Sequence, residues 1–210
     1  MRIIEVPEWD SSWEGYDPRF RLYLFTLAPG ASSAAVSTHD ILEANVHEAL
    51  EAAHMMSHGD TLLWSLALVE NSDGARGLRW LSGMDYNSAP LNAVEWRARR
   101  LMQDRYLSAV TRAGREPRLP DGRRVLRMFS DQQSGWPLWE SFTDHYIVTS
   151  DHLSLSSELS EDLTAWNSRF NDRALDDPLP EGWVEDGVKL WERLVAEIGD
   201  GAEVRPEFLG

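Results

Sequence analysis

Three histidines lie on a stretch whose apolar residues recur at helical spacing: His47, His54 and His58. His54 and His58 are four residues apart, which lets two imidazoles on one helix bind a single metal ion. His47 lies about three turns before His58 and cannot reach the same ion. Because the chain has no HExxH pattern and no cysteine, we expect histidines near a helix end and no metal centre.

Other catalytic patterns are incomplete. No serine stands in a G-x-S-x-G elbow, and the glycine motifs that bind phosphate are absent. Acidic pairs such as Glu161–Asp162 and Glu185–Asp186 have the residue type used in glycoside hydrolysis, but adjacency in sequence does not place two carboxylates across a cleft. We therefore expect no cofactor and no catalytic residue, and we favour a protein that is not an enzyme.

A polar loop, Gly83–Pro90, follows an apolar strand, and such loops often carry binding residues. Asp85, Tyr86 and Asn87 could form hydrogen bonds with a ligand, or the Asp or Asn could cap the following helix. The alternative hypothesis is therefore an enzyme or small-ligand-binding protein with a site between two units, near Asp85–Asn87 and His54/His58.

The segment SGWPLWESFTDHY, residues 134–146, combines two tryptophans with acids. Pro137 restricts Trp136 to extended geometry, so the loop could present Trp136 and Trp139 to a partner. The alternative is that both indoles fill the core of the C-terminal part. That core would also hold Trp166, Trp183 and Trp191.

Charge is distributed unevenly along the chain, whose net charge is −15. The first 127 residues hold 15 Arg/Lys and 17 Asp/Glu, and the last 83 hold 5 and 18. Arg97–Arg127 alone has 10 Arg against 3 acids. Either this segment pairs with the acidic part, within the chain or in a homo-oligomer, or the acidic part faces a basic protein. The negative total argues against nucleic-acid binding, with the basic segment Arg97–Arg127 as the one exception that could contact a duplex.

Our leading hypothesis is a non-enzymatic acidic protein that binds a basic protein partner. The acidic residues would steer association and the tryptophans would anchor it. The predicted partner-binding residues are Trp136, Trp139, Glu140, Asp144, Glu158, Glu161, Asp162, Asp176 and Asp177.

The elements that position these residues follow from periodicity and turn residues. The sequence predicts strands at Arg2–Val6, Phe20–Leu27, Thr61–Glu70, Leu78–Met84, Arg123–Ser130, Tyr146–Ser150 and 202–208. It predicts a loop at Ala28–Ser37, a hairpin turn at Asn71–Gly77, and helices at 41–58 (with an Asp40–Glu43 capping box), Leu91–Arg112, from Ser156 or Ser157, and from Trp183.

The mixture of elements lacks a steady β-α-β rhythm, which favours the α+β class. We expect two small units, each a short, mostly antiparallel sheet packed with one or two helices: residues 1–114 and an acidic 123–210, joined by a linker at 115–122. The chain shows no signal peptide and no cysteine, and its longest apolar run, Leu62–Val69, is too short to cross a bilayer. We therefore expect a cytoplasmic protein.

The C-terminal part also resembles a known group. The order GWPLWES, LSLSSELSEDLTAWNSRFND and GWVEDGVKLWERLVAEIG, within residues 123–205, is similar to small acidic uncharacterised actinobacterial proteins. Some members of that group are thought to be immunity-type partners of secreted toxins. The resemblance covers about 40% of the chain, and it implies an antitoxin-like inhibitor of a basic toxin or effector without assigning catalytic residues.

Overall fold

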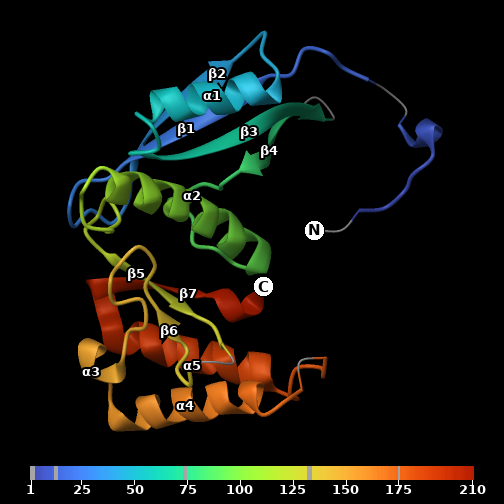
Figure 1. Ribbon diagram of the computed structural model, residues 1–210. Helices are drawn as coiled ribbons and strands as arrows, with labels where there is room; N and C mark the ends of the chain where they lie inside the picture. The colour runs from blue at the N-terminus through green and yellow to red at the C-terminus, as the bar shows by residue number, and fades with distance from the viewer. Residues whose placement is uncertain (1–2, 12–13, 73–74, 132–133, 175) are drawn as a thin grey trace.

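The computed structural model describes residues 3–11, 14–72, 75–131, 134–174 and 176–210. The protein is of the α+β class, with one four-stranded and one three-stranded sheet. Figure 1 shows helix α2 (Ala93–Arg112) lying between the two sheets, and side chains from both halves pack against it. The division into two units stays a prediction.

The first sheet is antiparallel throughout and has the order β2-β1-β3-β4. Its strands are β1 (Phe20–Thr26), β2 (Ala35–Ile41), β3 (Leu63–Ser72) and β4 (Ala75–Ser82). Strand β1 is apolar on both sides: Leu22 packs in the core beside helix α1 (Val46–Met56), and Phe25 packs in the core beside α2. The sheet therefore has one helix on each face.

Two local predictions in this half are wrong. Residues 35–41 form strand β2, where the sequence suggested a loop and then a helix start. Asp40 does not cap a helix, because its carboxylate pairs with Arg19 and Arg21 of the neighbouring chain segment. The capping box instead joins Asn45 and Glu48 at the start of α1.

The predicted strand at Arg2–Val6 is not formed by residues 3–6, which are exposed and unpaired, and Arg2 lies outside the described residues. The predicted hairpin is present: β3 and β4 are antiparallel up to the pair Ser72 and Ala75. Residues 73–74 of its turn also lie outside the described part.

The second sheet has the order β6-β5-β7 and carries helices on its outer side. The strands are β5 (Arg124–Met128), β6 (Leu138–Trp139) and β7 (Ala202–Pro206), and the helices are α3 (Ser150–Leu153), α4 (Ser157–Asn171) and α5 (Trp183–Ile198). Short 3₁₀ turns are η1 (Glu8–Asp10), η2 (Gly199–Gly201) and η3 (Glu207–Leu209). The β5–β6 pair is antiparallel and the β5–β7 pair is parallel. This parallel pair brings the end of the chain alongside β5.

The predicted strand Tyr146–Ser150 is reduced to a single bridge between Ile147 and Trp139. Strand β5 pairs with β6. The loop after β6 folds back, and the amide of Val148 donates to the carbonyl of Leu138 at 3.1 Å. The segment 115–122, which was predicted as a linker, packs against the rest of the protein, because Leu119 is buried in the same core as the α2 side chains.

Candidate functional site

The charged residues of the two halves meet in a buried cluster around Glu203. Arg99 donates through Nε and Nη2 to the two carboxylate oxygens of Glu203, at 2.7 and 2.8 Å. Gln103 donates to the same carboxylate at 2.8 Å, and Arg123 approaches it at 3.4 Å. Burial would raise the pKa of Glu203, but the hydrogen bonds and charge of Arg99 outweigh it and hold that pKa below its usual value.

Further ion pairs join the Arg97–Arg127 segment to the C-terminal part. Arg124 holds both oxygens of Glu140, with its Nη2 at 2.6 Å, and Arg127 pairs with Glu207 at 2.9 Å. In one further pair the arginine comes from the C-terminal part: Arg205, which is almost fully buried, donates to Asp104 of α2 at 2.8 Å. Part of the charge asymmetry is therefore neutralised inside the chain, by carboxylates at the small sheet.

The tryptophan segment lies largely inside the protein. Trp139 is 4% exposed, and its ring stacks on Phe129 with the centroids 5.1 Å apart. Trp136 is half-buried against the C-terminal core, and its Nε1 donates to the carbonyl of Val148 at 2.6 Å. Glu140 is buried with Arg124, whereas Asp144 is exposed. Of the four predicted contact residues in this segment, Asp144 and part of Trp136 are open to a partner, whereas Trp139 and Glu140 are buried.

The remaining predicted acids lie on α4 (Glu158, Glu161 and Asp162) or in the loop between α4 and α5 (Asp176 and Asp177). Residues 157–198 hold 11 Asp/Glu against 4 Arg/Lys. Their ion pairs are local: Arg193 of α5 contacts Asp162 at 2.6 Å and Glu158 at 3.4 Å. Glu161, Asp176 and Asp177 are exposed and form no ion pair with any residue in the described ranges. We call Glu158, Glu161, Asp162, Asp176 and Asp177 the acidic helical surface.

The histidines do not form a metal centre. His54 Nδ1 lies 3.0 Å from Asp60 Oδ2, and the other oxygen of Asp60 accepts from Trp64 Nε1 at 2.7 Å. Across the described part of the chain, no group of three His, Cys, Asp or Glu side chains is arranged to hold a metal ion. Asp60 therefore connects His54, near the end of α1, with Trp64 at the start of β3.

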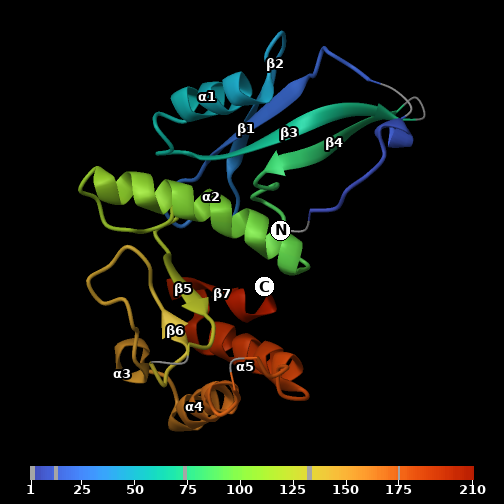
Figure 2. The ribbon, with the colours of Figure 1, turned by 45° about the vertical axis from the view of Figure 1, so that its right-hand side comes forward.

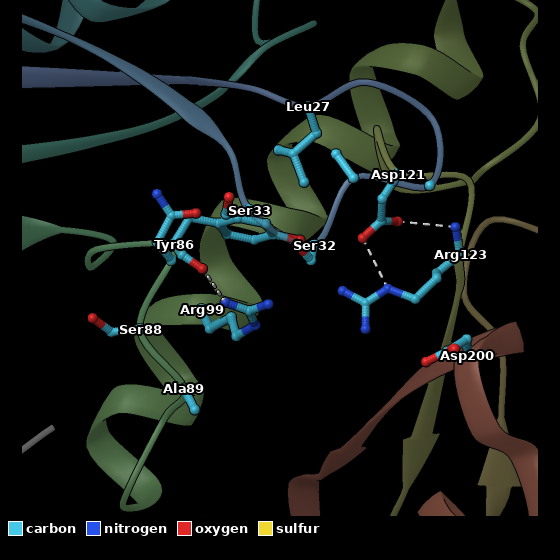
Figure 3. A pocket seen from close by; sticks show the side chains of 13 residues that line it. Leu27, Ser32, Ser33, Tyr86, Ser88, Ala89, Arg99, Asp121, Arg123 and Asp200 are labelled. Atoms are coloured by element: carbon cyan, nitrogen blue, oxygen red, sulfur yellow. Dashed lines mark hydrogen bonds and ion pairs between the residues drawn. The ribbon is translucent and has the colours of Figure 1, made fainter.

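A pocket of about 530 Å³ lies where the loops of the first sheet face the start of β5 (Figure 3). Of the residues named in the alternative hypothesis, Tyr86 and Asn87 line it, whereas Asp85, His54 and His58 do not. Asn87 is engaged with Ala34, accepting from its amide at 2.7 Å and donating to its carbonyl at 3.0 Å.

The charged groups of this pocket largely neutralise one another. Arg123 donates to Asp121 at 2.8 Å, and Arg99 donates to the carbonyl of Tyr86 at 2.9 Å while its guanidinium lies 4.1 Å from the Tyr86 ring centroid. Burial raises the pKa of Tyr86 to about 12, so its hydroxyl stays protonated. The carboxylate of Asp200 completes the lining (Figure 3). The pocket offers hydrogen bonds and mixed charge to a ligand.

The C-terminal sheet, α4 and α5 together form the part of the chain that known proteins resemble. Residues 124–205 match the Serratia CdiI immunity protein-like family. We call these residues the immunity-like region; it spans β5 to nearly the end of β7 and contains the whole acidic helical surface. The comparisons found no match among curated proteins and none among solved structures. Within the described ranges, no helix has the length and apolar content to cross a membrane.

Sequence reasoning missed the buried cluster around Glu203 and the role of Arg205. Both residues lie in the final strand, AEVRP, where alternation with apolar neighbours suggests an ordinary edge strand. The available signal was composition: the arginines of Arg97–Arg127 outnumber the acids of that segment and require carboxylates from elsewhere.

Proposed function

We propose that this protein is a non-enzymatic immunity-type inhibitor that binds a toxin protein, and that the acidic helical surface steers the association. The observation that carries the proposal is the match of residues 124–205 to an immunity protein-like family. The charge distribution supports a basic partner, because residues 157–198 carry seven more acids than bases.

The acids divide into two groups with different roles. Glu140, Glu203 and Glu207 are paired with arginines of the same chain, and the pair between Glu203 and Arg99 of α2 joins the N-terminal and C-terminal parts. Glu161, Asp176 and Asp177 form no ion pair among the described residues, and the contact of Arg173 with Asp177 is to its backbone carbonyl, at 2.9 Å, so the three carboxylates face solvent. Complementary fields of this kind raise association rates by about 10- to 1,000-fold at low salt.

Asp144 lies in the loop between β6 and α3, and the partly exposed Trp136 lies just before β6; both are within the immunity-like region. We propose them as a further contact. Trp139 and Glu140 would support Asp144 and Trp136 from inside the protein, because Trp139 stacks on Phe129 and Glu140 is paired with Arg124.

The test begins with capture of partners from the native host by the tagged full-length chain, with elution by salt. A captured protein is expected to arrest the growth of a heterologous host, and co-expression of the chain should restore growth. The matched variant is Glu161→Lys/Asp176→Lys/Asp177→Lys, which changes surface charge without touching a buried group. A captured protein without toxicity, or toxicity that the chain does not relieve, would contradict the proposal.

A second candidate function, binding of a small polar ligand, is favoured by the pocket between Tyr86 and Arg123. Arg123 has a solvent-accessible side chain and Asp200 contributes the opposite charge, so a ligand with both a cationic and an anionic group would fit best. Screening a panel of zwitterionic amino acids by thermal shift, with Asp200→Asn as the control, tests this candidate. Shifts that are equal in the two proteins would exclude this site.

A further inference from the structure

The segment before β1 carries several apolar side chains that are exposed to solvent. Residues 3–11, which we call the N-terminal arm, are all exposed, and Ile3 and Trp9 keep 83% and 82% of their surface. Figures 1 and 2 show the arm curving away from the sheet beside β3 and β4. Exposed apolar groups at this density mark an interaction segment.

Strand β4 presents an open edge on the same side of the molecule. It is the last strand of the order β2-β1-β3-β4, and no strand among the described residues pairs with its outer edge. It contains no proline, and Leu78, Trp80 and Leu81 stay substantially exposed. Such an edge is a template for a further strand unless something covers it.

The surface next to this edge is apolar with free positive charge. Alternation places Arg76, Leu78 and Trp80 on one face of β4, the face on which Trp80 contacts Tyr23 with centroids 5.1 Å apart. Arg76 forms no ion pair within the described part of the chain.

We propose that the N-terminal arm docks on β4 as a fifth strand of the first sheet. Ile4 and Val6 alternate around Glu5, so both apolar side chains can face the Leu78 and Trp80 side together. The acids Glu8 and Asp10 complement Arg76 and Arg97, a second arginine without an ionic partner among the described residues.

The occupant is the arm of the same chain, because the tether allows it. Residues 7–19 can span up to about 43 Å, while the position beyond β4 is three strand spacings, about 14 Å, from β1. A tethered segment has an effective concentration in the millimolar range, which a second copy reaches only in concentrated solution. The structure holds the arm undocked, so docking is the second state of an equilibrium. Docking protects the edge from pairing with other chains.

A cross-linking experiment tests the docked state. Because the natural sequence has no cysteine, only the two introduced thiols can react. The test variant is Val6→Cys/Leu78→Cys, and the matched control is Val6→Cys/Val36→Cys, with the second thiol on β2 at the opposite edge. With a short bis-maleimide at micromolar protein, we expect at least fivefold more intramolecular product from the test pair. Equal yields, or mainly cross-linked dimers, would overturn the proposal.

Hydrogen exchange gives a second measurement that needs no thiol. Amides on the outer edge of β4 should exchange at least fivefold faster in Ile4→Glu/Val6→Glu than in the unaltered chain. Circular dichroism should remain unchanged, because the altered residues are outside every core cluster. Identical exchange rates in the two proteins would show that the arm does not dock.

Discussion

Replacing Glu203 with Gln should destabilise the protein strongly. The change keeps the shape of the side chain and removes its charge, which leaves Arg99 buried without a counter-ion. Breaking a buried pair in this way costs about 3–5 kcal/mol. Since the amide oxygen can still accept one of the hydrogen bonds and Arg99 keeps its bond to the Tyr86 carbonyl, we expect a loss near the lower end, about 3 kcal/mol.

Urea unfolding followed by circular dichroism measures this loss. With a denaturant slope of about 2–3 kcal/mol per molar, the midpoint should fall by roughly 1–1.5 M. Glu70→Gln, which breaks the exposed pair with Arg79, is the control and should leave the midpoint unchanged. The double variant Arg99→Met/Glu203→Met should be less destabilised than the single one, because no buried charge remains unpaired. A shift below about 0.3 M for Glu203→Gln would refute this reasoning.

Two further predictions concern the first sheet. Hydrogen bonds from Arg21, and then Arg19, lower the pKa of Asp40 to about 2, so its stabilisation is present above its usual value of 3.8 and is lost as the pH falls through about 2. Asp40→Asn should therefore cost about 1 kcal/mol in urea unfolding at pH 6 and much less at about pH 2, where the folded carboxyl is half protonated. Gly83→Ala should cost more than 2 kcal/mol in urea unfolding, since a Cβ would lie 2.7 Å from Met102 Cγ, whereas Gly30→Ala, with open space around it, should cost about 1.

Local patterns predicted the elements that pack their own apolar residues. Strand β1 and helices α2, α4 and α5 follow from periodicity and caps, such as Ser156 before α4. Strand β2 was missed because AVSTHDI has little apolar alternation, and its conformation depends on pairing with β1. A segment that draws its stability from a neighbour distant in sequence gives little local signal.

The candidate site was predicted in the same partial way. Counting charges located the acidic C-terminal part, but only tertiary structure separates Glu140 and Glu203, which are buried with arginines, from Glu161 and Asp176, which face solvent. The same holds for Trp139, whose burial depends on Phe129 and Tyr146. The sequence alone did not show whether these side chains face the core or solvent.

The proposal that the acidic helical surface steers association is tested by the association rate with the captured partner, measured as a function of salt. For the unaltered chain, the rate should fall steeply between low and physiological ionic strength. For Glu161→Lys/Asp176→Lys/Asp177→Lys, it should be about tenfold lower at low salt and nearly independent of salt. Equal rates and equal salt slopes for the two proteins would contradict the claim that these carboxylates steer the partner.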